Sequence, residues 1–210
     1  LELFLTAANR GFAQTELPVK LQLNSEKSTV RVMRDSVLAT YWLFRIAAGQ
    51  RLGTYGKRAP LAPVWKRYQA RGFTRLFLLL RWAFTPYAEL ASKVPPAGRI
   101  LDLGAGHGLL TIATALQSEK REVLGIDHAE ARVAMARQAA KGLPGVRFET
   151  GAIYPFPDEL PRAGFRGVFL IDVLHYFSAE AQLELMRGAW DRLEPGGVVL
   201  VREVNPHGGL

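Results

Sequence analysis

The sequence contains no cysteine, which excludes disulfide bonds, thiolate metal ligands and cysteine nucleophiles. Histidine is scarce, with four residues, and no two of them have the spacing of zinc ligands, so we predict no metal site. Long hydrophobic runs are missing too. The stretch 37–48 is interrupted by Arg45 and is too short to span a bilayer. No secretory signal opens the chain. These absences favour a cytoplasmic protein, with membrane association as the alternative.

Acidic side chains are rare in residues 31–90, which hold eleven Lys or Arg against Asp35 and Glu89 and also carry eleven aromatic side chains. Three interpretations stay open for this basic-aromatic segment. Its helices pack on the rest of the protein with their cations turned outward. Alternatively, it makes peripheral contact with an anionic membrane. Nucleic-acid binding is the weakest alternative, because no Asn/Asp-Pro-Pro-Tyr-like motif for attack on a base amine is present.

A strand followed at once by glycines is the most informative pattern in the chain. Residues 100–103 are mostly apolar, and Gly104, Gly106 and Gly108 follow them before an apolar helix. We expect this turn to leave free backbone N–H groups at a helix N-terminus, where a nucleoside-bearing cofactor binds. The dinucleotide pattern G-x-G-x-x-G requires its third glycine one residue later than it stands here. The spacing therefore favours a cofactor without a pyrophosphate.

Strands and helices alternate after residue 97. We predict strands at 99–103, 122–126, 146–149, 167–172 and 197–204, and helices at 108–118, 129–141 and 179–193. This order implies an α/β fold, a Rossmann-like mostly parallel sheet with helices on both faces, preceded by a helical basic-aromatic segment. In that segment we predict helices at 64–69 and 74–93, the second kinked or restarted at Pro86. The second strand ends on Asp127, which can accept hydrogen bonds from ribose hydroxyls.

Four ordered motifs resemble those of the class I S-adenosylmethionine-dependent methyltransferases. They are LDLGAGHG at 101–108, GIDH at 125–128, FLIDVLHYF at 169–177 and LEPGG at 193–197. The resemblance implies S-adenosyl-L-methionine as the cofactor. The cofactor-binding residues that it implies are Asp102, Gly104, Ala105, Gly106, Asp127, His128, Ala152 and Asp172. It also places His175 beside the transferred methyl group, where we interpret the imidazole as a candidate general base, with a packing or hydrogen-bonding role as the alternative.

The chain departs from the family's pattern in two places. The family has Gly-Asp after the third strand, whereas Ala152 stands here, so a carboxylate contact to adenine is lost unless Asp158 supplies it. The family also continues past the fifth strand into an antiparallel pair, so we expect a truncated domain, with a five-stranded sheet that has an exposed edge as the alternative. Arg202 and Glu203 end that strand, and we interpret them as a solvated strand end rather than a substrate contact.

The front of the chain resembles the C-terminal tail of family 2 polyprenyl-phosphate-type glycosyltransferases. The matching pieces include ELPV at 16–19, SEKS at 25–28 and RDSV at 34–37. We therefore divide the chain into a glycosyltransferase-tail-like segment at 1–50, a basic-aromatic helical linker at 51–96 and a methyltransferase domain at 97–210. The start at Leu1 fits a fragment of a glycosyltransferase fusion.

The leading hypothesis is methyl transfer to a small-molecule, lipid-linked or glycan acceptor by in-line displacement. The alternative is a non-catalytic nucleotide-fold module attached to a membrane-associated glycosyltransferase. An acceptor hydroxyl needs a base, and His175 is the candidate, whereas an amine needs only to arrive deprotonated.

Overall fold

The computed structural model describes residues 2–3, 19–20, 64–161 and 163–203. The chain divides into two compact units. The first comprises Leu1–Leu5, Glu16–Ala59 and Ala70–Pro86, and the second comprises Thr6–Thr15, Pro60–Gln69 and Tyr87–Leu210. Most of the glycosyltransferase-like segment lies outside the described residues, so that resemblance stays a prediction.

The described part of the first unit holds three elements. β1 (Glu2–Leu3) pairs antiparallel with β2 (Val19–Lys20). α3 (Gly72–Phe84) follows later in the chain. The predicted helix 74–93 restarts at Pro86, because a proline disfavours the helical conformation in the residue before it. Thr85 is accordingly extended, with φ −111° and ψ 123°, and α4 (Tyr87–Ser92) begins in the second unit.

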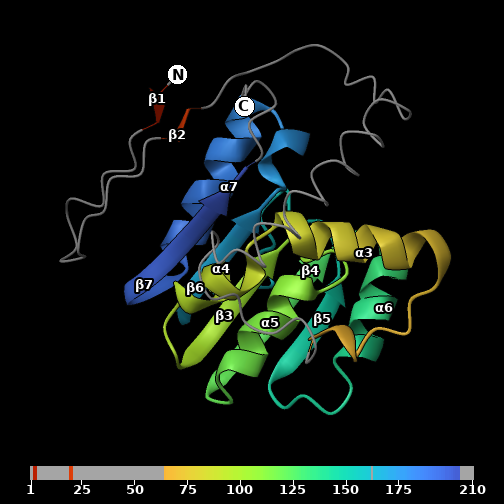
Figure 1. Ribbon diagram of the computed structural model, residues 1–210. Helices are drawn as coiled ribbons and strands as arrows, with labels where there is room; N and C mark the ends of the chain where they lie inside the picture. Colours follow the sequence, from red (N-terminus) through yellow and green to blue (C-terminus); the bar gives the residue numbers. More distant parts are fainter. Residues whose placement is uncertain (1, 4–18, 21–63, 162, 204–210) are drawn as a thin grey trace, which may run out of the picture. The chain divides into compact units, whose positions relative to one another are not determined.

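The second unit is built on a five-stranded sheet with the order β5-β4-β3-β6-β7 (Figure 1). The strands are β3 (Gly98–Leu103), β4 (Arg121–Asp127), β5 (Val146–Thr150), β6 (Phe165–Ile171) and β7 (Leu193–Arg202). Every neighbouring pair is parallel. The connecting helices are α5 (Leu109–Gln117), α6 (Glu130–Ala139) and α7 (Ala179–Asp191). The predicted α/β Rossmann-like fold is confirmed.

The order of the strands positions the site. The chain moves from β3 outward to β4 and β5, then returns to β6 on the other side of β3. Right-handed crossovers in opposite directions place α5 and α6 on one face and α7 on the other. Ligands in such sheets bind at the carboxyl ends of the strands where the order reverses. Here that point lies between β3 and β6.

Two predicted elements differ from the structure by more than two residues. β7 begins at Leu193 rather than at residue 197, because Leu193 already pairs with Phe165 of β6. The register then shifts at a bulge, and pairing continues from Val198 opposite Gly167. The helix predicted at 64–69 is helical only at 64–65 and turns at 66–67. Tertiary hydrogen bonds hold this segment. Arg67 donates to the carbonyls of Ala139 (3.4 Å) and Lys141 (3.1 Å).

A buried arginine links the amino end of the sheet to α5 and to the segment before β3. Arg121 is 4% exposed, and its guanidinium donates to three backbone carbonyls at 2.9 Å, those of Val94, Pro95 and Thr114. These bonds join the start of β4 to α5 and to the segment before β3. Burial lowers the pKa of Arg121. The sequence pattern did not single out this residue.

Candidate cofactor site and polar network

The glycine loop after β3 is shaped by close packing. Gly104 and Gly108 have φ of +77° and +78°, a region that side chains other than glycine rarely adopt. A Cβ on Gly104 would lie 2.6 Å from Cγ2 of Val173, and one on Gly108 would lie 2.5 Å from the ring of Phe148. At Gly106 the nearest atom to such a Cβ is an oxygen of Asp127, at 3.9 Å. Gly104 and Gly108 thus serve packing, while Gly106 leaves space in the loop.

The backbone N–H groups of this loop are already used within the protein. The amides of Gly104 and Ala105 donate to the carbonyl of Ile126, at 2.8 and 2.9 Å, and Gly108 donates to the carbonyl of Ala105 at 2.9 Å. Gly106 donates to Oδ2 of Asp127 at 2.9 Å. The expectation of free amides was therefore wrong for residues 104–106 and 108. The end of β4 supplies the acceptors for the first three of these amides, and the loop itself supplies the acceptor for Gly108.

Asp127 ends β4 and faces the glycine loop. Its side chain is 5% exposed, and Oδ1 accepts from the amide of Ala129 at 2.9 Å. The nearest cation is Arg132, 3.8 Å from Oδ1. His128 also lies 3.8 Å from this oxygen, with its own side chain 76% exposed. Asp127 is the acid that the sequence pattern selected, and its contact with a cofactor stays a prediction.

The remaining predicted cofactor residues differ in their surroundings. Asp102 is buried on β3, and its Oδ2 accepts from the hydroxyl of Thr111 on α5 at 2.5 Å. This bond ties strand to helix next to the glycine loop. Ala152 is exposed just beyond β5, where the amide of Gly151 donates to the carbonyl of Asp127 at 3.1 Å. Asp158 is exposed in the following loop.

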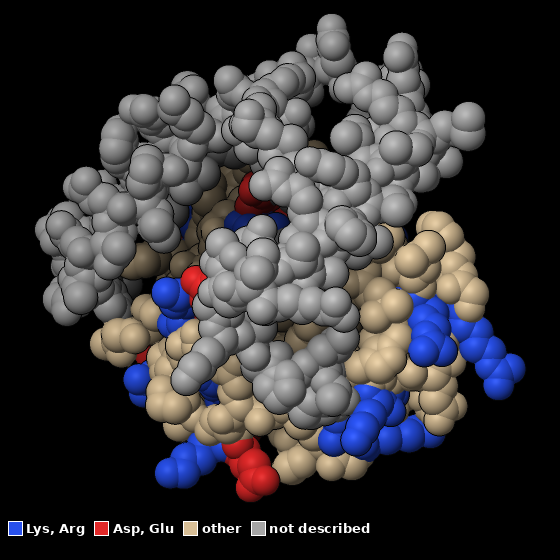
Figure 2. All heavy atoms as spheres, in the orientation of Figure 1, with Lys and Arg blue, Asp and Glu red and all other residues tan. Residues whose placement is uncertain are grey.

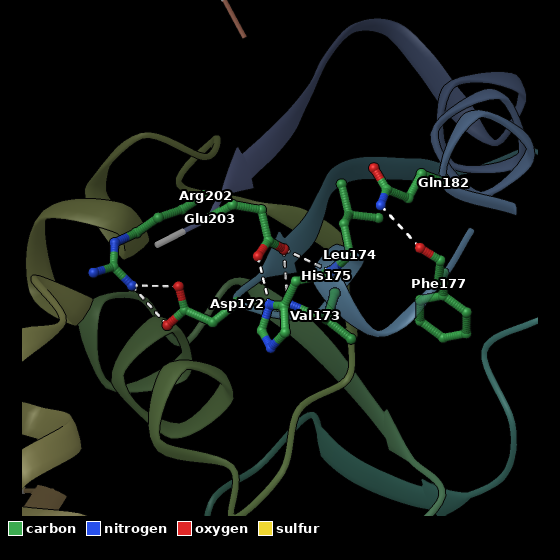
Figure 3. A network of polar contacts seen from close by, with 8 residues as sticks. All are labelled: Asp172, Val173, Leu174, His175, Phe177, Gln182, Arg202 and Glu203. Atoms are coloured by element: carbon green, nitrogen blue, oxygen red, sulfur yellow. Dashed lines mark hydrogen bonds and ion pairs between the residues drawn. The ribbon is translucent and has the colours of Figure 1, made fainter. Parts of the chain in front are cut away.

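A second cluster of polar groups lies where β6 and β7 end (Figure 3). Asp172 follows β6 with a φ of +53°, and its amide donates to the carbonyl of Arg202 at 2.7 Å. Its carboxylate accepts from the Arg202 guanidinium at 2.7 and 2.6 Å. The Asp172 side chain is only 3% exposed, so the ion pair is largely buried on the acid's side. Arg202 is therefore a structural partner, not the solvated strand end that we expected.

Glu203 holds the turn that carries His175. Its Oε1 accepts from the amides of Val173 (2.8 Å) and Leu174 (2.6 Å). Its Oε2 lies 2.7 Å from Nδ1 of His175. The interpretation of Glu203 as a solvated strand end was also wrong. The signal that points to it is its position: neighbouring parallel strands end at the same sheet edge, so an acid after β7 meets the turn after β6.

Among the described residues, Tyr68 contacts the glycine loop. The hydroxyl of Tyr68 donates to the carbonyl of His107 at 2.7 Å, and Tyr68 is 7% exposed. Burial is the main reason that the pKa of Tyr68 is raised well above its ordinary value, and the charges of Tyr87 and Asp102 raise it further. The sequence pattern missed Tyr68, and nothing local distinguishes it from the other aromatic residues around it.

Membrane contact by residues 31–90 stays a prediction. On α3, Phe73 is 80% exposed and Leu76 is 49% exposed. Figure 2 shows the Lys and Arg side chains of the described residues in separate groups on the face in view. Within the described ranges, every helix falls short of the length and hydropathy that crossing a membrane requires.

Comparisons with known proteins agree with this arrangement. Residues 100–197 match the family model described as a methyltransferase domain. The trans-aconitate 2-methyltransferase of Deinococcus radiodurans is 34% identical over 123 residues, or 56% of this chain and 43% of that protein. The chain therefore spans less than half the length of this curated relative.

A solved structure supports the fold. The amino pentose methyltransferase of Micromonospora echinaspora, solved with S-adenosylmethionine bound, is 24% identical, with a TM-score of 0.50 over 65% of this chain and 59% of that one. Its likeness concerns the arrangement of strands and helices. Residues 100–197 of this chain are therefore similar to a methyltransferase domain, and the strands and helices have the arrangement of the class I methyltransferase fold.

Proposed function

We propose that this chain binds S-adenosylmethionine at the glycine loop and transfers its methyl group to a small-molecule acceptor. One observation carries the proposal: the amides of residues 104–106 and 108 donate within the protein, beside a buried carboxylate. A phosphate needs such amides free. Both a dinucleotide and S-adenosylmethionine carry a ribose diol that the carboxylate can bind, but S-adenosylmethionine has no phosphate and so does not need these amides. The residues present therefore fit S-adenosylmethionine better than a dinucleotide.

The predicted residues have distinct roles in this proposal. Asp127 accepts hydrogen bonds from the ribose hydroxyls, and Gly104, Ala105 and Gly106 form the floor beneath the nucleoside. His128 and Ala152 border the adenine side, since both lie next to Asp127 or the strand end beside it. The two remaining carboxylates, Asp102 and Asp172, stay predicted contacts at the methionine end, where Thr111 and Arg202 hold them in place.

Methyl transfer makes modest chemical demands on the protein. The donor, when bound, supplies a methyl group on a positively charged sulfur that is a good leaving group. The protein's part is then to place the acceptor and to exclude water. His175 is the proposed base for an acceptor that must lose a proton. A small-molecule acceptor is proposed ahead of a lipid-linked or glycan acceptor because the curated relative is, by its name, a trans-aconitate methyltransferase.

Calorimetric titration tests the proposal directly. We expect heat of binding from S-adenosylmethionine and from S-adenosylhomocysteine, and none from NAD, which carries the pyrophosphate that the loop does not accommodate. A folded sample that gives no heat with either sulfur compound overturns the proposal. Binding of NAD in their place overturns it as well.

A further inference from the structure

Glu203 makes three contacts with the turn after β6: two are to backbone amides, and the third is to the ring of His175. We propose that Glu203 is a positioning residue, which fixes His175 in the form that accepts a proton and thereby suits this site to a hydroxyl acceptor. The inference rests on the proposed methyl transfer. It deepens that proposal by assigning the class of atom that receives the methyl group.

The short contact between Glu203 and His175 determines the tautomer of the ring. An ionised carboxylate can only accept hydrogen bonds, so Nδ1 must carry the hydrogen across the 2.7 Å separation. A neutral imidazole holds one hydrogen on its two nitrogens, which leaves a lone pair on Nε2. Figure 3 shows this second nitrogen turned away from Glu203. In its neutral form the ring thus presents a base rather than a donor to its surroundings.

The turn that carries His175 lies against the cofactor loop. Cγ2 of Val173 occupies the space where a Cβ on Gly104 would stand, at 2.6 Å. β3 and β6 are neighbours, with Leu103 paired to Leu170. His175 therefore follows within a few residues of a side chain in contact with the glycine loop. Its side chain is 47% exposed, which leaves the ring accessible to an acceptor.

The chemistry of the step requires such a base only for some acceptors. As the acceptor oxygen forms its bond to the methyl carbon, the carbon–sulfur bond breaks and its electron pair returns to sulfur. The hydroxyl proton passes to Nε2 of His175, and the imidazolium that results is stabilised by the carboxylate of Glu203. An amine that arrives deprotonated needs no such acceptor in the methyl-transfer step. A fixed base at this edge therefore accelerates transfer to a hydroxyl in particular.

Glutamine at position 203 separates the positioning role from the structural one. Glu203→Gln keeps an oxygen for the amides of Val173 and Leu174. Its amide nitrogen, however, donates to Nδ1 and so favours the opposite tautomer, with hydrogen on Nε2. Replacing the carboxylate in a histidine–carboxylate pair of this kind, with geometry retained, lowers turnover by up to about 10⁴-fold in a serine protease. Glu194→Gln is the matched control, since Glu194 lies near the other end of β7.

The first measurement is the nitrogen NMR spectrum of the histidine rings in the uniformly labelled full chain, with His175 assigned by its loss in His175→Gln. We expect hydrogen on Nδ1 in the wild type and in Glu194→Gln, and on Nε2 in Glu203→Gln. Hydrogen on Nε2 in the wild type, or an unchanged tautomer in Glu203→Gln, overturns the inference. This result stands whatever the natural acceptor is.

The second measurement is transfer of labelled methyl from S-adenosylmethionine to catechol, with 1,2-diaminobenzene as the amine counterpart. We expect Glu203→Gln to lower kcat for catechol by about 10²- to 10⁴-fold, with the KM for catechol within about twofold of the wild type. Because Glu203 acts through His175, the double variant Glu203→Gln with His175→Gln should be no slower than His175→Gln alone. The inference is overturned if methyl is transferred to the amine only, or if kcat for catechol is unchanged in Glu203→Gln. S-adenosylhomocysteine binding should be unchanged in every variant, so its loss would point instead to failure of the proposed function.

Discussion

Replacement of Asp127 is the sharpest test of where the cofactor binds. A carboxylate has about four lone-pair positions, and in this structure the amides of Gly106 and Ala129 take one on each oxygen, both at 2.9 Å. The two that are left match the two hydroxyls of a ribose. Asp127→Ala removes both acceptors. Hydrogen bonds to charged groups contribute about 1.5–3 kcal/mol each, part of which the freed hydroxyls recover from water.

We therefore expect Asp127→Ala to weaken S-adenosylhomocysteine binding by about 1–3 kcal/mol, which corresponds to an increase in Kd of roughly 5- to 150-fold. Titration calorimetry measures this at a temperature where circular dichroism shows the variant folded, because the two lost amide acceptors also lower the free energy of unfolding. Glu122→Ala is the control: it removes an exposed carboxylate from the opposite end of the same strand. A Kd within twofold of the wild type in folded Asp127→Ala would remove this residue from the pocket.

Two further predictions concern stability. The pKa of Tyr68 is raised in the folded protein, so ionisation of its hydroxyl favours the unfolded chain. Its contribution to the free energy of unfolding is therefore complete below the ordinary tyrosine pKa of about 10 and falls by about 1.4 kcal/mol per pH unit above it. Urea unfolding between pH 8 and 11 should show a shallower alkaline loss in Tyr68→Phe, and an identical slope would contradict the argument. Arg121→Met deprives three carbonyls, two of them buried, of their donor, so we expect the free energy of unfolding to fall by about 2–4 kcal/mol. Replacement of the exposed Lys120 by Met should leave it within about 0.5 kcal/mol of the wild type.

The fold was predictable because its signals are local. Buried parallel strands appear as short apolar runs, and the glycines at 104–108 mark the turn from β3 into α5. Alternating strands and helices then imply a parallel sheet. The boundary at Leu193 was missed because a Pro-Gly-Gly sequence normally ends pairing, while here the strand continues through a bulge opposite Phe165. The helix predicted at 64–69 was wrong for a related reason: its residues find hydrogen-bond partners far along the chain.

The prediction of free amides failed at residues 104–106 and 108 for a specific physical reason. Local sequence shows that a glycine turn exposes N–H groups, but it does not show which acceptors stand opposite. Ile126 and Asp127 lie about twenty residues away in sequence, and the pairing of β3 with β4 brings them to the loop. Together with the glycine spacing, this arrangement favours a cofactor without a phosphate.

The sequence by itself determined the class of fold, the strand–glycine turn and the acid at position 127, since each depends on residues close together in the chain. Only the tertiary structure decided the partners of His175, Asp172 and Glu203. Ile171 is paired with Arg202 in the β6–β7 register, and this register sets an acid beside a histidine 28 residues earlier. Side-chain chemistry at the sheet edge depends on strand register, and register is settled by packing over the whole sheet rather than by any one segment.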